Sequence, residues 1–177
     1  MPPMNDLEIY ISIARQELEL RQGERVAACW PVSTALKGAG NREGSYQTPL
    51  GRHRIRARIG AGQPLNTVFR GRRPTGEIYT EVIGREFPER DWILTRILWL
   101  TGLEPGRNRG GDQDTLRRYI YIHGCPDSEP MGIPRSHGCI RMRNADLIEM
   151  FDLVANGTLV EIQEGTEAFR TGVGGLD

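Results

Sequence analysis

Apolar residues occupy every second position over much of the N-terminal part of the chain. A period of two is typical of a β-strand with one buried face, and Gly23 suits a tight turn between two such strands. The pattern predicts a β-hairpin with its turn at residues 21–24, in which Cys29 is a small residue on the opposite face. The alternating residues are Ile9, Ile11, Ile13, Leu18 and Leu20 before the turn, and Val26, Ala28, Trp30 and Val32 after it.

A second alternation runs from residue 52 to residue 59, directly after a loop-like stretch at 33–51 that is rich in Gly, Ser, Thr and Pro. We interpret its arginine face as solvated rather than as an anion-binding stripe, because charged rows commonly keep sheet edges apart. We interpret His53 as a hydrogen-bonded core or cleft residue rather than a metal ligand. The two faces are Arg52, Arg54, Arg56 and Arg58, and His53, Ile55, Ala57 and Ile59.

The middle of the chain gives weaker signals. Residues 60–76 look irregular, whereas residues 77–83 and 91–100 are rich enough in β-branched and aromatic residues to predict strands. Residues 101–118 are rich in glycine and mixed charges and predict a long loop. Such a loop is either a lid over a functional site or a disordered surface excursion. A strand at 118–122 follows and ends at His123.

The C-terminal part predicts a helix and a final strand. Apolar residues recur at helical spacing between 147 and 154, Asn144 is a favourable N-cap, and Asn156-Gly157 suits a helix end. Residues 158–162 predict a strand.

These elements add up to a mostly β domain with at least one helix, of the α+β class. We expect a single domain over residues 1–177, with a flexible C-terminal tail from about residue 165.

Composition narrows the function classes. Lys plus Arg and Asp plus Glu are both 23, so no net charge recruits nucleic acid or an anionic membrane. The most apolar run, 92–100, contains Arg96 and is too short for membrane insertion. Three cysteines argue against a disulfide framework. No secretory signal is visible, so we expect a cytoplasmic protein, or a periplasmic one if a signal was removed. Nothing in the sequence indicates an oligomeric state.

Two short segments concentrate the reactive side chains. Two of the three histidines and two of the three cysteines lie in His123-Gly124-Cys125 and in Ser136-His137-Gly138-Cys139. Cysteine is a useful nucleophile as the thiolate, and a neighbouring imidazole can remove its proton near neutral pH. We therefore expect Cys139 to attack an acyl carbon while His123 takes the thiol proton.

Two other interpretations of these residues stay open. The paired histidines and cysteines offer the donors of a zinc site, but one residue separates each pair, where structural zinc motifs usually have two to four. Alternatively, small buried cysteines and core histidines simply pack together. We rank acyl transfer first and zinc last, and expect neither a metal nor a cofactor.

The segment Ser136-His137-Gly138-Cys139-Ile140-Arg141, with His123-Gly124 upstream, resembles the signature of the L,D-transpeptidase (YkuD-type) catalytic domain. Thr48-Pro49-Leu50-Gly51 resembles that family's Thr-Pro-x-Gly segment, and the similarity spans most of the chain. The resemblance implies a YkuD-like β-sandwich and a cysteine that attacks peptidoglycan tetrapeptide stems. The bond attacked joins the L-centre of diaminopimelate, or its equivalent, to the terminal D-alanine.

The resemblance also implies roles for single residues. Cys139 would be the nucleophile and His123 the general base, with the imidazole held by the main-chain carbonyl of Gly124. Backbone N–H groups near Gly138 and Cys139 would form an oxyanion hole.

The other motif residues have less specific roles. Ser136 and His137 would shape the loop that precedes the nucleophile. Arg141 would either bind a substrate carboxylate or brace the turn, and we hold these two roles level.

Three features depart from the family pattern. No export signal or wall-binding module is visible, and His53 stands where an aromatic residue is common. Cys125 is an additional thiol close to His123, and we advance the hypothesis that it pairs with Cys139 under oxidation.

The expected substrates are peptidoglycan stem peptides or muropeptides. The absence of a visible export signal favours L,D-carboxypeptidation in muropeptide recycling over L,D-transpeptidation, which would form 3–3 cross-links or protein attachments in the wall. A non-catalytic module that binds wall peptides is the alternative from another class.

Overall fold

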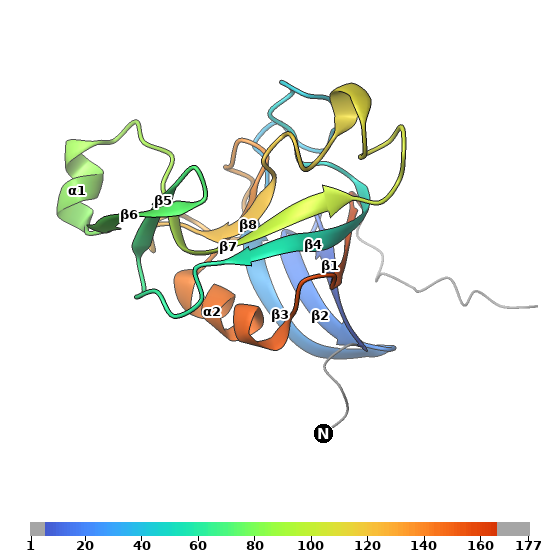
Figure 1. The fold of residues 1–177 in the computed structure, drawn as a ribbon, viewed down its shortest axis with the longest axis horizontal. Coiled ribbons are helices and arrows are strands. Elements are labelled where there is room, and N and C mark those ends of the chain that lie inside the picture. The colour runs from blue at the N-terminus through green and yellow to red at the C-terminus, as the bar shows by residue number, and fades with distance from the viewer. Residues whose placement is uncertain (1–5, 166–177) are drawn as a thin grey trace, which may run out of the picture.

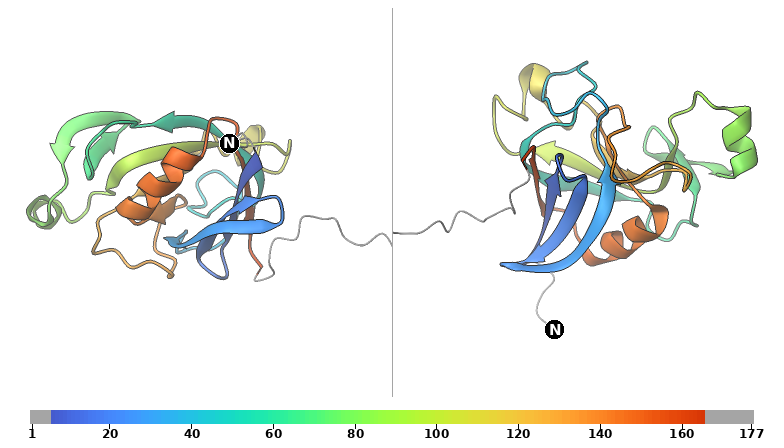
Figure 2. Two further views of the ribbon diagram at one scale, coloured as in Figure 1. Left: turned by 90° about the horizontal axis from the view of Figure 1, so that it is seen from below. Right: turned by 180° about the vertical axis from the view of Figure 1, so that it is seen from behind.

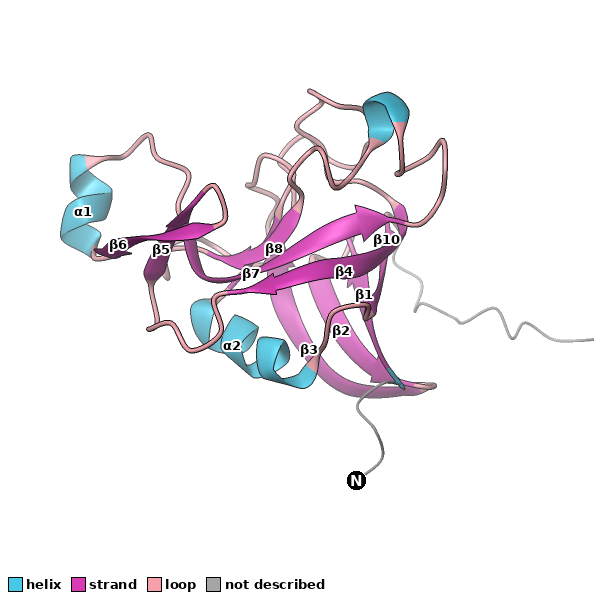
Figure 3. Cartoon of the chain, viewed as in Figure 1, coloured by secondary structure: helices cyan, strands magenta, loops and turns pink. Residues whose placement is uncertain are grey.

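The protein is described by a computed structural model over residues 6–165. These residues form mainly strands, with two α-helices and a 3-10 turn at Gly111–Gln113 (Figure 3). The strands are β1 Leu7–Ser12, β2 Glu17–Gln22, β3 Arg25–Ser33, β4 Gly51–Ile59, β5 Thr67–Arg70, β6 Arg73–Ile78, β7 Ile93–Gly102, β8 Tyr121–Gly124, β9 Ile140–Met142 and β10 Leu159–Gln163, and the helices are α1 Glu81–Glu86 and α2 Asn144–Leu153.

The strands form one sheet that closes on itself. Its order is β4-β10-β1-β2-β3-β9-β8-β7-β5-β6, and an added β4–β7 pairing turns the part from β4 to β7 into a closed ring. The β5–β6 hairpin and α1 project from one side of this ring (Figure 1). The mostly β fold with at least one helix, predicted from the sequence, is confirmed.

The core fills the ring and is closed by α2. Leu147, Met150 and Phe151 on α2 are buried and belong to the same apolar cluster as residues from both sides of the ring. Seen from below, α2 lies between two groups of strands, with β4 and β7 on one side and the N-terminal strands on the other (Figure 2). Neither helix within residues 6–165 is long and apolar enough to cross a membrane.

The N-terminal prediction was right about strands and wrong about their number. The expected hairpin is a three-stranded meander, because the chain turns once more at residues 13–16 between β1 and β2. This turn contains no glycine or proline, the residues that usually mark a turn in a sequence, and Gln16 adopts the positive φ of 52°. Cys29 lies in a strand, β3, as predicted, and its side chain is exposed.

The region from 60 to 83 was predicted wrongly. Residues 60–76, expected to be irregular, contain β5 and most of β6, and residues 77–83, expected to be a strand, contain the start of α1. The signal that was missed is Thr80, whose hydroxyl accepts a hydrogen bond from the Ile83 N–H and so caps α1. Pro74 is tolerated because β6 is the edge strand.

Most remaining elements lie close to their predicted places, but the strand expected at 118–122 begins only at Tyr121, because the chain is still turning at Tyr119, which has a positive φ of 56°. The strands expected at 52–59, 91–100 and 158–162 are confirmed as β4, β7 and β10. The helix ends at Leu153, before the expected stop at Asn156-Gly157. The tail expected from about residue 165 lies almost wholly outside the described residues.

The alternation along β4 separates its faces as expected. Arg52, Arg54 and Arg56 are exposed, whereas His53 and Ile55 are buried. A register shift after Ile55 ends the regular pattern.

Candidate active site

Strands β8 and β9 place Cys139 and His123 on one face of the sheet. The strands are parallel neighbours, with His123 opposite Arg141 and Ile122 opposite Ile140. Both isoleucines point into the core, so alternation turns the side chains of His123, Arg141 and Cys139 to the other face. The structure therefore places on one face the two residues that the sequence predicted to act together.

A single hydrogen bond fixes the orientation of the His123 ring. Its Nδ1 lies 2.6 Å from the carbonyl oxygen of Gly124, and because a carbonyl only accepts, Nδ1 carries the hydrogen. This leaves Nε2 as the free base. Burial lowers the pKa of His123, which keeps the imidazole neutral near pH 7. The contact expected from the family resemblance is present.

The Cys139 thiol lies between a main-chain group just before β8 and one in its first residue. The Tyr121 N–H donates to Sγ at 3.3 Å, and Sγ contacts the Tyr119 carbonyl at 3.4 Å. Burial raises the pKa of the thiol to about 12. With His123 neutral as well, the resting pair consists of a thiol and an imidazole rather than a thiolate and an imidazolium.

The loop before Cys139 is shaped by Ser136 and Gly138. The buried Ser136 hydroxyl donates to the Cys139 carbonyl and accepts the Gly138 N–H at 3.2 Å. Gly138 has a φ of 129°, and an added Cβ would lie 3.2 Å from the Gln47 carbonyl. Ser136 and Gly138 thus build the turn, and the Gly138 N–H expected in the oxyanion hole is already engaged.

Thr48 joins the Thr48–Gly51 segment to this loop. Its fully buried hydroxyl donates to the Gly138 carbonyl at 2.9 Å and accepts the Ala35 N–H at 3.0 Å. The two sequence motifs, far apart along the chain, therefore meet through one side chain. These two hydrogen bonds explain why the first motif has a threonine at this position.

Replacing Thr48 by valine is expected to lower both stability and turnover. The change leaves two buried main-chain groups without this partner, and each such group costs about 1–3 kcal/mol of unfolding free energy. The freed Gly138 carbonyl also displaces Cys139, and we expect turnover to fall roughly ten- to a hundredfold. Urea unfolding and steady-state kinetics measure the two effects.

Thr48→Ser is the matched control, since it keeps the hydroxyl. Equal losses in the serine and valine variants would contradict the assigned role of the hydrogen bonds.

Asn144 is a site residue whose role the sequence analysis missed. It was expected to cap α2, but Arg143 occupies the N-cap position and Asn144 is the first helical residue. Its buried amide donates to the Cys125 carbonyl at 2.8 Å and accepts from the Thr95 hydroxyl at 2.6 Å. A Cβ on Gly124 would lie 2.2 Å from its Oδ1, so this packing requires glycine beside His123.

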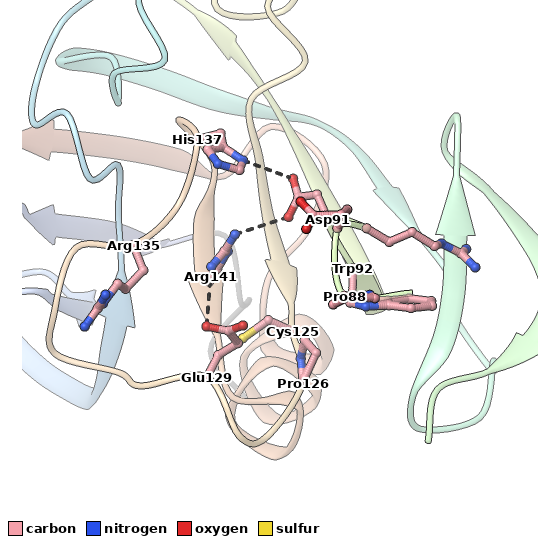
Figure 4. Close-up of a pocket in the computed structure, with 11 residues that line it drawn as sticks. Pro88, Asp91, Trp92, Cys125, Pro126, Glu129, Arg135, His137 and Arg141 are labelled. Atoms are coloured by element: carbon pink, nitrogen blue, oxygen red, sulfur yellow. Dashed lines mark hydrogen bonds and ion pairs between the residues drawn. The ribbon is translucent and has the colours of Figure 1, made fainter. Parts of the chain in front are cut away.

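A pocket of about 300 Å³ opens beside the motif, lined by charged side chains (Figure 4). Arg141 bridges two carboxylates there, at 3.2 Å from Asp91 and 3.8 Å from Glu129. The exposed His137 lies 3.9 Å from Asp91. The two ion pairs favour the bracing role of Arg141. Sequence reasoning missed Asp91, which no motif marks.

The proposed Cys125–Cys139 disulfide is wrong. The Tyr121 N–H contacts Cys139, and Cys125 lies four residues further along the same direction, a separation of about 13 Å. A disulfide needs Cα atoms within about 7 Å. Cys125 is instead a buried thiol that contacts the Met142 carbonyl at 3.6 Å.

The zinc interpretation finds no geometry to support it. Within residues 6–165, no group of three or more His, Cys, Asp or Glu side chains gathers closely enough to hold a metal ion.

The loop at 101–118 is hydrogen-bonded to β4 and to the residue before it. Buried Asn108 donates to the main-chain carbonyls of Leu50 and Arg52 at 3.1 and 3.0 Å. Thr115 lies 3.0 Å from Nε2 of His53, whose Nδ1 contacts the Gly51 carbonyl. The loop is therefore not a disordered excursion, and His53 is the hydrogen-bonded core residue that was predicted. A lid role for the loop stays a prediction.

Known proteins similar to this chain are L,D-transpeptidases, the family that the sequence motifs resemble. A family model described as the L,D-transpeptidase catalytic domain, YkuD, matches residues 6–162. The putative L,D-transpeptidase YkuD of Bacillus subtilis is 36% identical over 90 residues, which cover 50% of this chain and 44% of that protein. That of Bacillus licheniformis is 41% identical over 59 residues, covering 33% and 36%. The matches thus span less than half the length of these relatives.

Solved structures share the fold at low sequence identity. An L,D-transpeptidase from Xylanimonas cellulosilytica superposes with a TM-score of 0.57 at 17% identity, covering 92% of this chain and 63% of that one. An L,D-transpeptidase from Mycobacterium smegmatis gives 0.52 at 16% identity, covering 89% and 58%.

Proposed function

The chain belongs to the L,D-transpeptidase catalytic domain family (YkuD), and from this premise we propose that it is a cysteine acyl-transfer enzyme acting on peptidoglycan stem peptides. The substrate proposed is a tetrapeptide stem, cleaved between the L-centre of its third residue and the terminal D-alanine. The observation that carries the proposal is that Cys139 and a neutral His123, whose tautomer is fixed by the Gly124 carbonyl, lie on the same face of the neighbouring strands β8 and β9.

The first half-reaction forms a thioester. Sγ of Cys139 attacks the carbonyl carbon while its proton passes to Nε2 of His123, because a thiol with a raised pKa must lose its proton as it attacks. The C–N bond then breaks, and the departing nitrogen takes the proton from Nε2. D-alanine leaves, and the stem stays bound to Sγ.

The negative charge on the substrate oxygen needs a main-chain donor. The Gly138 N–H is already used by Ser136, so we assign this role to the Cys139 N–H. One such donor is typically worth about 2.7–4 kcal/mol of transition-state stabilisation.

The thioester has two possible fates. In hydrolysis, water attacks while Nε2 takes its proton, and Sγ recovers the proton as the C–S bond breaks, leaving a tripeptide. In transfer, an amine takes the place of water and a new peptide bond forms. We propose hydrolysis, L,D-carboxypeptidation, as the principal reaction and L,D-transpeptidation as the second candidate; the family membership supports a transpeptidase-type function and favours neither acceptor.

A product analysis separates these reactions. The protein is incubated with a disaccharide tetrapeptide and an excess of D-methionine, and the products are identified by mass spectrometry. We expect a tripeptide product that lacks one alanine residue. D-Methionine exchange or dimers would establish transpeptidation in its place, and an unchanged tetrapeptide would favour a non-catalytic binding module.

A further inference from the structure

A cation braced by aromatic rings lies beside the nucleophile and has no part in the mechanism above. The guanidinium carbon of Arg72 lies 4.8 Å from the ring centre of Trp99 and 4.9 Å from that of Tyr119. Its Nη1 donates to the Tyr121 hydroxyl at 3.2 Å. Trp99 and Tyr119 stack on each other, with ring centres 6.1 Å apart. We call these three aromatic residues the aromatic cradle.

The cradle is in direct contact with Cys139. Main-chain groups of Tyr119 and Tyr121 are the two that touch Sγ, at 3.4 and 3.3 Å. The Cys139 side chain also packs in the same apolar cluster as Trp99 and Tyr121. The guanidinium of Arg72 therefore lies against the side chains of residues whose main-chain groups touch the sulfur, where β8 begins.

The charge of Arg72 has no carboxylate partner within residues 6–165, where the ion pairs join other residues. This contrasts with Arg141, which already contacts Asp91 and Glu129. A guanidinium has five N–H donors, and only one of them is used by Tyr121. Stacking holds the fork in place, which lowers the entropy lost when it binds an anion.

We propose that Arg72 binds the α-carboxylate of the terminal D-amino acid of the substrate, with the small side chain of that residue against the aromatic cradle. The assignment rests on the proposed function. The residue that leaves is joined to the reacting carbonyl through its nitrogen, and its carboxylate is one carbon further on. The carboxylate therefore has to lie a few ångströms from Sγ, next to the residues that form the aromatic cradle.

This assignment names the substrate class as stems with a free C-terminal carboxylate. Because the leaving amine and an incoming amine occupy the same place, a free D-amino acid acceptor would use the same fork. Arg72 is thus a residue that determines specificity, and it contributes no proton to the reaction.

The first test compares two tetrapeptides, one with a free C-terminal carboxylate and one with a C-terminal amide. In Arg72→Gln we expect kcat/KM for the acid to fall about tenfold and that for the amide to stay within about twofold, since a charged hydrogen bond is lost only for the acid. Arg72→Lys should restore part of the preference. Arg70→Gln, an exposed arginine on the same hairpin, is the matched control and should keep it. An equal fall for both peptides would overturn the proposal.

The second test needs no turnover. In a Cys29→Ala background, Cys139 is alkylated at pH 9 by iodoacetate, which carries a carboxylate, and by neutral iodoacetamide, and modification is followed by peptide mass spectrometry. The ratio of the two rates cancels any change in thiol pKa. We expect Arg72→Gln to lower this ratio about three- to tenfold and Arg70→Gln to leave it unchanged.

The two tests distinguish failure of this proposal from failure of the proposed function. If the wild-type protein cleaves neither peptide but the alkylation ratio falls in Arg72→Gln, the enzyme assignment fails and the carboxylate site stands. If the ratio is the same in both proteins, the carboxylate site fails, whatever the turnover.

Discussion

The Cys139→Ala variant is expected to release no measurable D-alanine from a disaccharide tetrapeptide, a loss of at least about a thousandfold in turnover. The reason is that the thioester cannot form without Sγ, and the methyl group of alanine offers no other nucleophile. Incubation with substrate followed by mass spectrometry of the products measures the loss. Intact mass of the wild-type protein should in addition reveal the acyl-enzyme when the reaction is stopped with acid.

Cys29→Ala is the matched control for this variant. Cys29 is exposed on β3, and its thiol lies 3.7 Å from the Glu17 carboxylate, so its removal should leave turnover unchanged. Thermal unfolding of both variants separates loss of chemistry from loss of fold. A Cys139→Ala protein that keeps even a tenth of the wild-type turnover would refute the nucleophile assignment.

The parts of the fold that could be predicted are those in which local pattern and final environment agree. Strand β4 is the clearest case, because its arginines alternate with residues that face the core until the register shifts after Ile55. The same holds for β7 and β10. The meander at the N-terminus was harder, since the turn at 13–16 interrupts the pattern without a glycine or proline.

Where local signals competed, the wrong one was chosen. Val82 and Ile83 are β-branched and indicated a strand, yet a capping hydroxyl on Thr80 starts a helix there. Asn144 is a good N-cap by type, but its amide binds the Cys125 carbonyl from the first helical position. Propensity describes what a residue does in isolation, and here contacts distant in sequence decided the outcome.

Some residues of the candidate site could be predicted from the sequence, and others could not. The pair of Cys139 and His123, and the carbonyl of Gly124, follow from residue type and from the resemblance to a family. Asp91 and Arg72 did not, because each acquires its meaning from a partner far away in the chain: Arg141 for the first and the aromatic cradle for the second. Single-sequence reasoning has no access to such pairs, whereas the sheet order brings them together directly.

His123→Gln is expected to lower turnover about 10²- to 10⁴-fold, the usual contribution of a general base. A glutamine amide can still donate to the Gly124 carbonyl, but it offers no basic nitrogen to Cys139. The loss should therefore appear in kcat with little change in stability. Urea unfolding provides the control, and a variant that unfolds much more easily than the wild type would require Asn in place of Gln.

The pH dependence distinguishes a base from a merely structural histidine. Because burial lowers the pKa of His123, the wild-type rate should rise with pH below 6.5 and be level by neutrality, as the imidazole loses its proton. It should not fall again through pH 9, because the pKa of the Cys139 thiol is raised to about 12 and the reactive form stays a thiol.

In His123→Gln the decline of the rate at acid pH should vanish. The residual rate should instead rise steadily with pH, because hydroxide then removes the thiol proton without the help of an imidazole. A resting thiolate–imidazolium pair would behave oppositely: the wild-type rate would fall as the imidazolium loses its proton. An unchanged decline at acid pH in His123→Gln would assign that titration to another group and remove His123 from the mechanism.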